Sequence, residues 1–153
     1  MIRASVLVLG LIISSAAYAK DIAVCGASEG YSYFPEAGLL AAPESEDAGK
    51  WKTDAISSGR LTLSRSGDRF DLLFTDATGA VISARGDGGE VVRVGQTADA
   101  ITVVVNYSGS LVETYTFIKA AGGAEAIWST NKYGTLIPKI GAYRAPCSLL
   151  VLE

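Results

Sequence analysis

Side chains able to act as acids, bases or nucleophiles are few in this sequence, and histidine is absent. Without an imidazole, Ser-His-Asp catalysis, Cys-His catalysis and histidine-rich zinc or copper sites are excluded, because no other side chain has an unperturbed pKa near neutrality. The segment Ser129-Thr130-Asn131-Lys132 matches S-x-x-K, in which a lysine activates a serine, but the companion S-D-N and K-T-G motifs are missing. We therefore predict a protein that is not an enzyme and that holds neither a metal nor another cofactor.

Two pairs of carboxylates stand close together in the sequence, Asp68 with Asp71 and Asp87 with Glu90. A glycosidase needs two carboxylates that face each other across a cleft, and a calcium site needs several oxygen ligands that converge in one loop. Both pairs lie in or beside turns that contain glycine, where aspartate is common for backbone reasons. We interpret them as solvated turn residues.

Three aromatic residues, Tyr31, Tyr33 and Phe34, cluster just before Pro35. Aromatic side chains on a loop can cover a pocket or contact a partner, because each offers a large apolar surface. The alternative is that they pack inward and fasten the loop to the core. These three residues are the candidate contacts for a ligand or a protein partner, and both interpretations stay open on the sequence alone.

Residues 1–19 have the three parts of a secretory signal. Arg3 supplies the positive start, an apolar run spans 4–13, and Ala17-Tyr18-Ala19 fits an A-x-A cleavage site. The apolar run is shorter than the roughly 20 residues that cross a bilayer, so we predict a cleaved signal rather than a membrane anchor. No later apolar stretch is long enough to span a membrane. The mature chain is expected to begin at Lys20 and to be periplasmic or secreted.

The mature chain keeps two cysteines, Cys25 and Cys147, one near each end. In an exported protein the default expectation is a disulfide between them. Such a bond would close a loop of about 120 residues and would stabilise the fold by roughly 4–5 kcal/mol on the chain-entropy model. The C-x-x-C spacing of a redox-active pair is absent, so the predicted bond is structural.

Length and charge narrow the organisation and the partners. Removing residues 1–19 from the 153 leaves 134, which suits one domain. Twelve basic residues then stand against sixteen acidic ones, a net charge of about −4. Nucleic acid and anionic membrane surfaces are therefore poor candidates, because both reward clustered lysine and arginine.

Residues 20–58 are predicted to form a loop-rich N-terminal segment. Glycine and proline recur at short intervals there, and 44–47 is an acidic run. Residues 36–42 could form one or two helical turns, which Pro43 would end. We expect this segment to belong to one domain with a β-meander over 59–153.

The clearest fold signal lies in residues 100–118. Apolar side chains alternate with others over 101–107, which is the period of a strand, and Ser108-Gly109-Ser110 then reverses the chain into a second strand. The same alternation of strand and turn recurs before and after this hairpin. It predicts eight strands, at 60–65, 69–75, 80–85, 90–96, 100–107, 111–118, 124–130 and 138–148.

An antiparallel meander of eight strands leaves costly open edges unless it closes on itself. We therefore predict an all-β fold, an eight-stranded up-and-down barrel, with a two-sheet β-sandwich as the alternative. Such a barrel would be nearly full, because its inward-facing residues include Ile101, Val103, Val105, Tyr107, Phe70, Phe74 and Trp128.

Gly49-Lys50-Trp51 ahead of these strands, together with Arg144 on the last one, resembles the lipocalin and calycin pattern. In those barrels a Gly-x-Trp opens the first strand and an arginine from the last strand packs on the ring. The resemblance implies structural roles for Trp51 and Arg144. The opening, Cys25-Gly26 with Tyr33-Phe34-Pro35-Glu36, is also similar to that of small, uncharacterised exported bacterial proteins.

These observations favour an exported, non-catalytic binding domain. Its ligand would be a small apolar or amphipathic molecule. The alternative is a protein partner, for example with the chain as an inhibitor of an exported hydrolase, because Ser108-Gly109-Ser110 resembles the Ser/Gly-rich loop of periplasmic lysozyme inhibitors. In either case we expect a shallow contact surface that combines Tyr31, Tyr33 and Phe34 with the turns at one barrel end.

Overall fold

The fold is all-β in the computed structural model, which describes residues 18–41, 46, 48–75 and 78–152. Residues 1–17 of the predicted signal at 1–19, the end of the predicted helical turns at 42, and Pro43 lie outside the described residues. The elements are β1 (Lys20–Cys25), β2 (Ser28–Phe34), the 3-10 helix η1 (Gly38–Ala41), β3 (Lys50–Ile56), β4 (Arg60–Ser66), β5 (Arg69–Thr75), β6 (Val81–Ser83), β7 (Glu90–Gln96), β8 (Ala100–Tyr107), β9 (Leu111–Ala120), β10 (Gly123–Lys132) and β11 (Lys139–Leu150).

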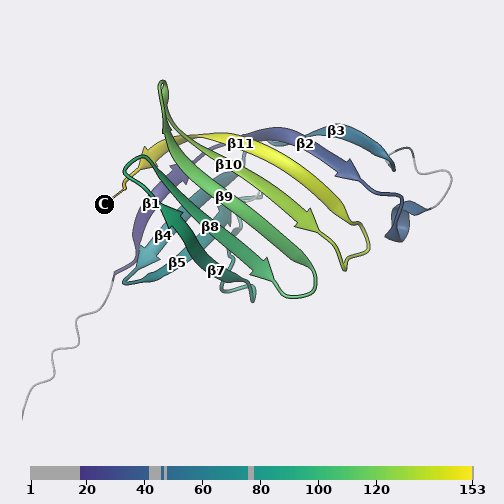
Figure 1. Cartoon of the computed structure of the whole chain (residues 1–153), viewed down its shortest axis with the longest axis horizontal. Coiled ribbons are helices and arrows are strands. Elements are labelled where there is room, and N and C mark those ends of the chain that lie inside the picture. The colour runs from purple at the N-terminus through teal and green to yellow at the C-terminus, as the bar shows by residue number, and fades with distance from the viewer. Residues whose placement is uncertain (1–17, 42–45, 47, 76–77, 153) are drawn as a thin grey trace, which may run out of the picture.

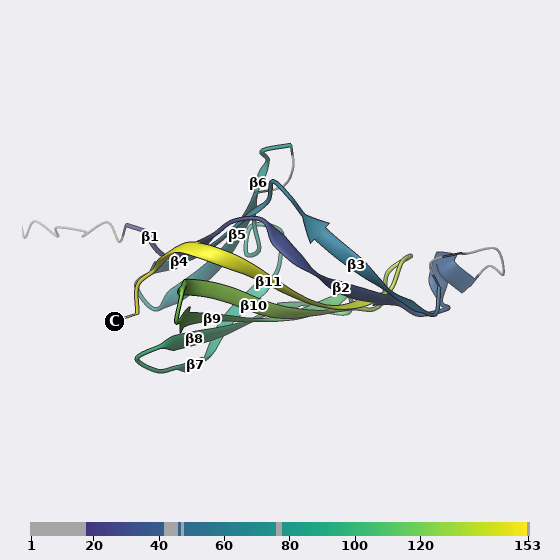
Figure 2. The same cartoon turned by 90° about the horizontal axis from the view of Figure 1, so that it is seen from above.

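All these strands belong to one antiparallel sheet that is curled into an open half-barrel (Figures 1 and 2). Its order is β6-β5-β4-β1-β11-β10-β9-β8-β7, and β2 and β3 continue the sheet beside β11. The prediction of an all-β antiparallel fold is confirmed. The prediction of a closed eight-stranded barrel is wrong, because the ladder among the described residues ends at β6 on one side and at β7 on the other.

The barrel stays open because β6 is too short to continue the backbone hydrogen bonding from β5 to β7. It pairs with β5 only over residues 81–83, and the chain then turns before β7 begins. The side chain of Arg85 spans this seam instead. Its Nε donates to the carbonyl of Phe70 on β5 at 2.5 Å, and its Nη2 donates to the carbonyl of Val91 on β7 at 2.6 Å. One guanidinium thus connects the two sides of the seam where backbone pairing is missing.

The long strand β11 organises the N-terminal half of the chain. Its C-terminal part pairs with β1, for example Leu150 with Ala23, and its N-terminal part pairs with β2, for example Ile140 with Tyr33. On their other side, β1 pairs with β4 and β2 pairs with β3. The two segments β1–β2 and β3–β4 therefore run side by side as two long, bent antiparallel arms.

Two strands, β2 and β3, replace the loop expected at 28–34 and 50–56. The physical reason is that their inner faces are polar, with Ser28 and Ser32 on β2 and Asp54 on β3. The apolar alternation that signals a strand is therefore missing from the sequence. Pairing of β2 with the long strand β11, and of β3 with β2, imposes the extended conformation, because strand formation depends strongly on tertiary context.

The core fills the inner face of the half-barrel and is formed by two groups of strands. Leu63 on β4 and Leu72 on β5 are fully buried on one side, and Val103, Val105 and Phe117 on β8 and β9 are fully buried on the other. Of the residues predicted to point inward, Ile101, Val103, Val105 and Phe70 are buried, while Phe74, Tyr107 and Trp128 are partly buried against the core. These buried side chains fill one end of the interior of the half-barrel, and the other end is hollow.

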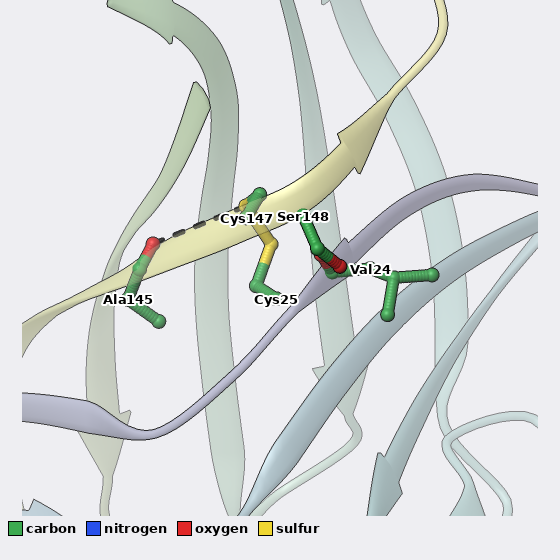
Figure 3. Close-up of a disulfide and its surroundings, with 5 residues drawn as sticks. All are labelled: Val24, Cys25, Ala145, Cys147 and Ser148. Carbon is green, nitrogen blue, oxygen red and sulfur yellow. Dashed lines mark hydrogen bonds between the residues drawn. A yellow bond between two sulfur atoms is a disulfide. The ribbon is translucent and has the colours of Figure 1, made fainter. Parts of the chain in front are cut away.

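A disulfide joins Cys147 to Cys25, the residue at which β1 ends and the chain continues into β2 (Figure 3). The predicted pairing is confirmed. Beside it, the amide of Gly26 donates to the carbonyl of Pro146, and the hydroxyl of Ser148 donates to the carbonyl of Val24. The bond therefore fixes the bend of the β1–β2 arm to the middle of β11, next to the hollow part of the inner face.

Candidate functional site

The inner face contains a cavity of about 340 Å³ at its unfilled end, between the β3–β4 arm and strands β9, β10 and β11. This volume is at the lower end of the range for small-molecule sites. Its apolar walls come from Ile56, Leu61, Phe74 and Leu111. The remaining lining is aromatic and charged, and its arrangement decides what the cavity can bind.

Three aromatic rings form a row along the floor of the cavity. Tyr115 on β9, Trp128 on β10 and Tyr143 on β11 are directly opposite one another in the strand register. The ring centroids of Tyr115 and Trp128 are 5.6 Å apart, those of Trp128 and Tyr143 are 5.2 Å apart, and both pairs are stacked. Because tyrosines stack on both sides of the indole, a ligand meets ring edges and hydroxyl groups rather than an open aromatic face.

Two glycines allow Tyr143 to reach across the sheet. A Cβ atom on Gly30 would collide with the carbonyl of Ala142 and come within 2.7 Å of Cδ1 of Tyr143. A Cβ atom on Gly141 would lie 2.6 Å from the Tyr143 hydroxyl. The absence of side chains at these two positions therefore gives the ring the space to lie over β2, with its hydroxyl directed toward Asp54.

Asp54 is the centre of the first polar cluster. Its Oδ2 atom accepts hydrogen bonds from Ser32 at 2.8 Å, from Tyr143 at 2.8 Å and from Lys139 at 2.9 Å. The hydroxyl oxygens of Ser32 and Tyr143 are also 2.5 Å apart. The two hydroxyl groups therefore have two protons for three close contacts, one with each other and two with Asp54. Donors from β2 and β11 thus converge on one carboxylate oxygen of β3.

The cluster shifts the pKa of each ionisable member. Desolvation raises the pKa of Asp54, but the hydrogen bonds from Lys139, Tyr143 and Ser32 outweigh it and leave that pKa below its usual value. Desolvation lowers the pKa of Lys139, and its contacts with Tyr143 and Asp54 reverse the effect and raise it. Asp54 and Lys139 are therefore held in their charged forms.

Glu113 is the centre of the second polar cluster. Its Oε2 atom accepts a hydrogen bond from the Tyr115 hydroxyl at 2.7 Å, and Thr130 opposite it on β10 is a further hydrogen-bond partner. Desolvation raises the pKa of Glu113, and the hydrogen bonds and the charges of Lys139 and Lys132 offset this only in part. Burial, and after it the Glu113 carboxylate, raises the pKa of Tyr115 well above its usual value.

The side chains of this arrangement are held by contacts within the protein. Ser32 is fully buried beneath Tyr143, so its hydroxyl is out of reach of a substrate. In the part of the chain that the structure describes, no group of three His, Cys, Asp or Glu side chains could hold a metal ion. Every buried side-chain nitrogen or oxygen among those residues has a hydrogen-bond partner. These hydrogen bonds hold the polar groups in defined positions, and such preorganisation reduces the cost of binding a ligand.

The predicted contact residues Tyr31, Tyr33 and Phe34 lie on β2 and not on a loop. Successive side chains of a strand point to opposite faces. Tyr31 and Tyr33 therefore face outward, whereas Phe34 shares the side of the buried Ser32. The strand separates the three aromatics onto two faces of the sheet.

Trp51 and Arg144 lie on neighbouring parts of the outer face. Trp51 is 61% exposed, and its ring contacts that of Tyr33 at 5.6 Å. Arg144 forms an exposed ion pair with Glu29 at 3.2 Å. Among the described residues, the Trp51 ring therefore contacts Tyr33, and the Arg144 guanidinium contacts Glu29. These contacts differ from the arginine-on-tryptophan packing that the lipocalin resemblance implies.

The residues that build the pocket are mostly ones that the sequence does not single out, namely Ser32, Asp54, Glu113, Tyr115, Lys139 and Tyr143. One signal was present. The predicted strands 111–118 and 124–130 are joined by a short glycine turn, which indicates that they pair, and the observed register of this pair places Tyr115 opposite Trp128. The contacts of Asp54 with Ser32, Lys139 and Tyr143 connect three distant segments and have no counterpart in local sequence.

No family model, no curated protein and no solved structure matches this chain. The resemblance to lipocalins therefore rests on the few residues quoted for it. None of the helices in the described part of the chain is long and apolar enough to cross a membrane.

Proposed function

We propose that this protein is an exported, non-catalytic binding domain that holds a small amphipathic ligand in the cavity of the half-barrel. The observation that carries the proposal is the combination of apolar walls with two preorganised polar clusters in one concave site. The disulfide supports export, because such bonds persist in oxidising compartments. An apolar body would contact Leu61, Phe74 and Ile56, while a polar head would meet the charged end.

A second candidate is a protein partner that binds the outer face, for example an exported hydrolase inhibited by this chain. It is supported by a row of residues on the outer face that are aligned across three strands: Ile140 on β11 and Trp51 on β3, which are exposed, and Tyr33 on β2, which is half-buried between them. The exposed Tyr31 follows in the next row and borders an outer groove of about 730 Å³ with Ile127 and Ala142. This face would present a wide, shallow surface of the kind that protein partners use.

Two matched substitutions separate these candidates. Thr75 lines the cavity and Thr53 lines the outer groove, and each lies on a strand. The probe is 1-anilinonaphthalene-8-sulfonate, an amphipathic dye whose emission rises in apolar sites. We expect Thr75→Trp to fill the cavity and to weaken dye binding about tenfold, a loss of about 1.4 kcal/mol.

Thr53→Trp is the control and should leave the affinity of the dye unchanged. Loss of binding in Thr53→Trp with retention in Thr75→Trp would move the site to the outer face and would overturn the proposal. Thermal unfolding of both variants checks that each remains folded under the conditions of the titration.

A further inference from the structure

The charged end of the cavity contains a pair of like charges in direct opposition. Lys132, the last residue of β10, is directly opposite Lys139, the first residue of β11, and both line the cavity. Like charges directly opposite each other in an antiparallel pair destabilise the sheet. A local conflict of this kind is expected where a ligand supplies the missing counter-charge.

The surrounding charges leave a positive excess at this end. Three basic side chains, Arg60, Lys132 and Lys139, line the cavity together with two carboxylates, Asp54 and Glu113. Asp54 Oδ2 already accepts from Lys139 and from two hydroxyls. Glu113 faces both lysines and also accepts from Tyr115. One positive charge therefore remains unmatched within the lining, which a single anionic group would neutralise.

The aromatic row argues against a cationic ligand. A cation gains most from an open aromatic face, and both faces of Trp128 have tyrosine rings stacked on them. Ring edges carry the positive end of the aromatic quadrupole, so edges directed at the cavity favour an electron-rich group over a cation.

We infer that the ligand is a small amphipathic monoanion, whose oxyanion head lies between Lys132 and Lys139 and whose apolar body lies against Ile56, Leu61 and Phe74. This inference rests on the proposed function and specifies the class of ligand. Lysine suits the role, because an ammonium group is a point charge with three donors that can turn toward an oxyanion.

The test uses three probes with the same body and different heads: 4-phenylbutanoate, 4-phenylbutanol and 4-phenylbutylamine. Binding to the full mature protein is measured by isothermal titration calorimetry at low ionic strength. We expect the carboxylate to bind about tenfold more tightly than the alcohol, as charge-assisted hydrogen bonds allow, and the amine to bind more weakly than both. Added salt should reduce the advantage of the carboxylate.

Lys132→Met removes the charge at the pocket while keeping most of the side-chain stem, and it leaves the Asp54–Lys139 contact in place. It should reduce carboxylate affinity about tenfold and leave alcohol affinity unchanged. Lys119→Met is the control, because Lys119 pairs with the exposed Asp99 away from the cavity. It should change neither affinity.

Equal affinity for the carboxylate and the alcohol, or tighter binding of the amine, would overturn the inference while leaving a functional amphipathic pocket. Failure of all three probes to bind would contradict both the inference and the proposed function. Equal losses in Lys132→Met and Lys119→Met would show a general charge effect and would also overturn the assignment of the head group to this lysine pair.

Discussion

The Nζ atom of Lys139 lies 2.9 Å from Oδ2 of Asp54, although 85 positions separate the two residues in the sequence. The contact joins β3 to β11 across β2 and is about 30% exposed at both side chains. We expect Asp54→Asn to destabilise the fold by about 1–2 kcal/mol, because three donors lose a charged acceptor in a partly solvated site. Urea unfolding measures the change.

The matched control for that substitution is Asp99→Asn. Asp99 also pairs with a lysine, Lys119, but its side chain is 75% exposed. We expect a change within about 0.5 kcal/mol there, because exposed ion pairs contribute little. Equal effects at both positions would contradict the central role given to Asp54.

The protonation of Glu113 gives stability a defined pH dependence. Burial raises its pKa above the usual 4.5, so the folded protein binds this proton more tightly than the unfolded chain. The resulting stabilisation is complete below the unfolded pKa and is lost as the pH rises through the folded pKa. Glu113→Gln should therefore gain stability relative to the wild type as the pH rises from about 4.5.

Urea midpoints of the two proteins, compared at a series of pH values, test this expectation, since contributions from other carboxylates largely cancel in the difference. The pH dependence of the contribution from Asp54 has the opposite sign. Asp54 stabilises the fold at pH values above its usual pKa of 3.8, and this stabilisation is lost on acidification. A difference between wild type and Glu113→Gln that is flat with pH, or that favours the wild type as the pH rises, would refute the burial argument.

Gly30 is a sharp test of how Tyr143 is positioned. Gly30→Ala places a methyl group against Cδ1 of Tyr143 and against the backbone of β11. We expect a loss of about 1–3 kcal/mol in unfolding free energy, because the rigid neighbours must shift. Gly26→Ala, in the same long arm, meets nothing within 4 Å and should be nearly neutral. Neutrality of Gly30→Ala would mean that the ring does not need this space.

Arg85 should control the open seam of the half-barrel. Arg85→Met removes both hydrogen bonds to the carbonyls of Phe70 and Val91. We expect faster amide hydrogen exchange in β7 and a loss of about 1–3 kcal/mol in global stability. Arg65→Met is the control, because Nε of Arg65 bonds to Gly67 within its own hairpin. Unchanged exchange in β7 would show that the seam holds without the guanidinium.

Local patterns predicted the part of this fold that depends on sequence neighbours. The alternation at 101–107 specifies a strand and its buried face, and the glycine turn between β9 and β10 specifies that these two strands pair. The disulfide followed from cysteine number and the expected export. Each of these inferences needs only a short segment or a count.

The missed features depend on contacts between distant segments. β2 and β3 have polar inner faces, so the sequence around Ser32 and Asp54 has the pattern of a loop; these segments become strands because β2 pairs with β11 and β3 pairs with β2. The barrel does not close because β6 is only three residues long. The pocket forms where the β3–β4 arm faces strands β9, β10 and β11, and that arrangement has no periodic signal in the sequence.

The central claim, that the ligand enters the cavity of the half-barrel, is tested most directly by the indole N–H signals in a ¹H–¹⁵N correlation spectrum. The protein has two tryptophans, Trp128 at the cavity and Trp51 on the outer face. On titration with 4-phenylbutanoate, we predict that the Trp128 signal shifts in a saturable manner while the Trp51 signal stays in place. A saturable shift of Trp51 with an unmoved Trp128 would contradict the account and place binding on the outer face.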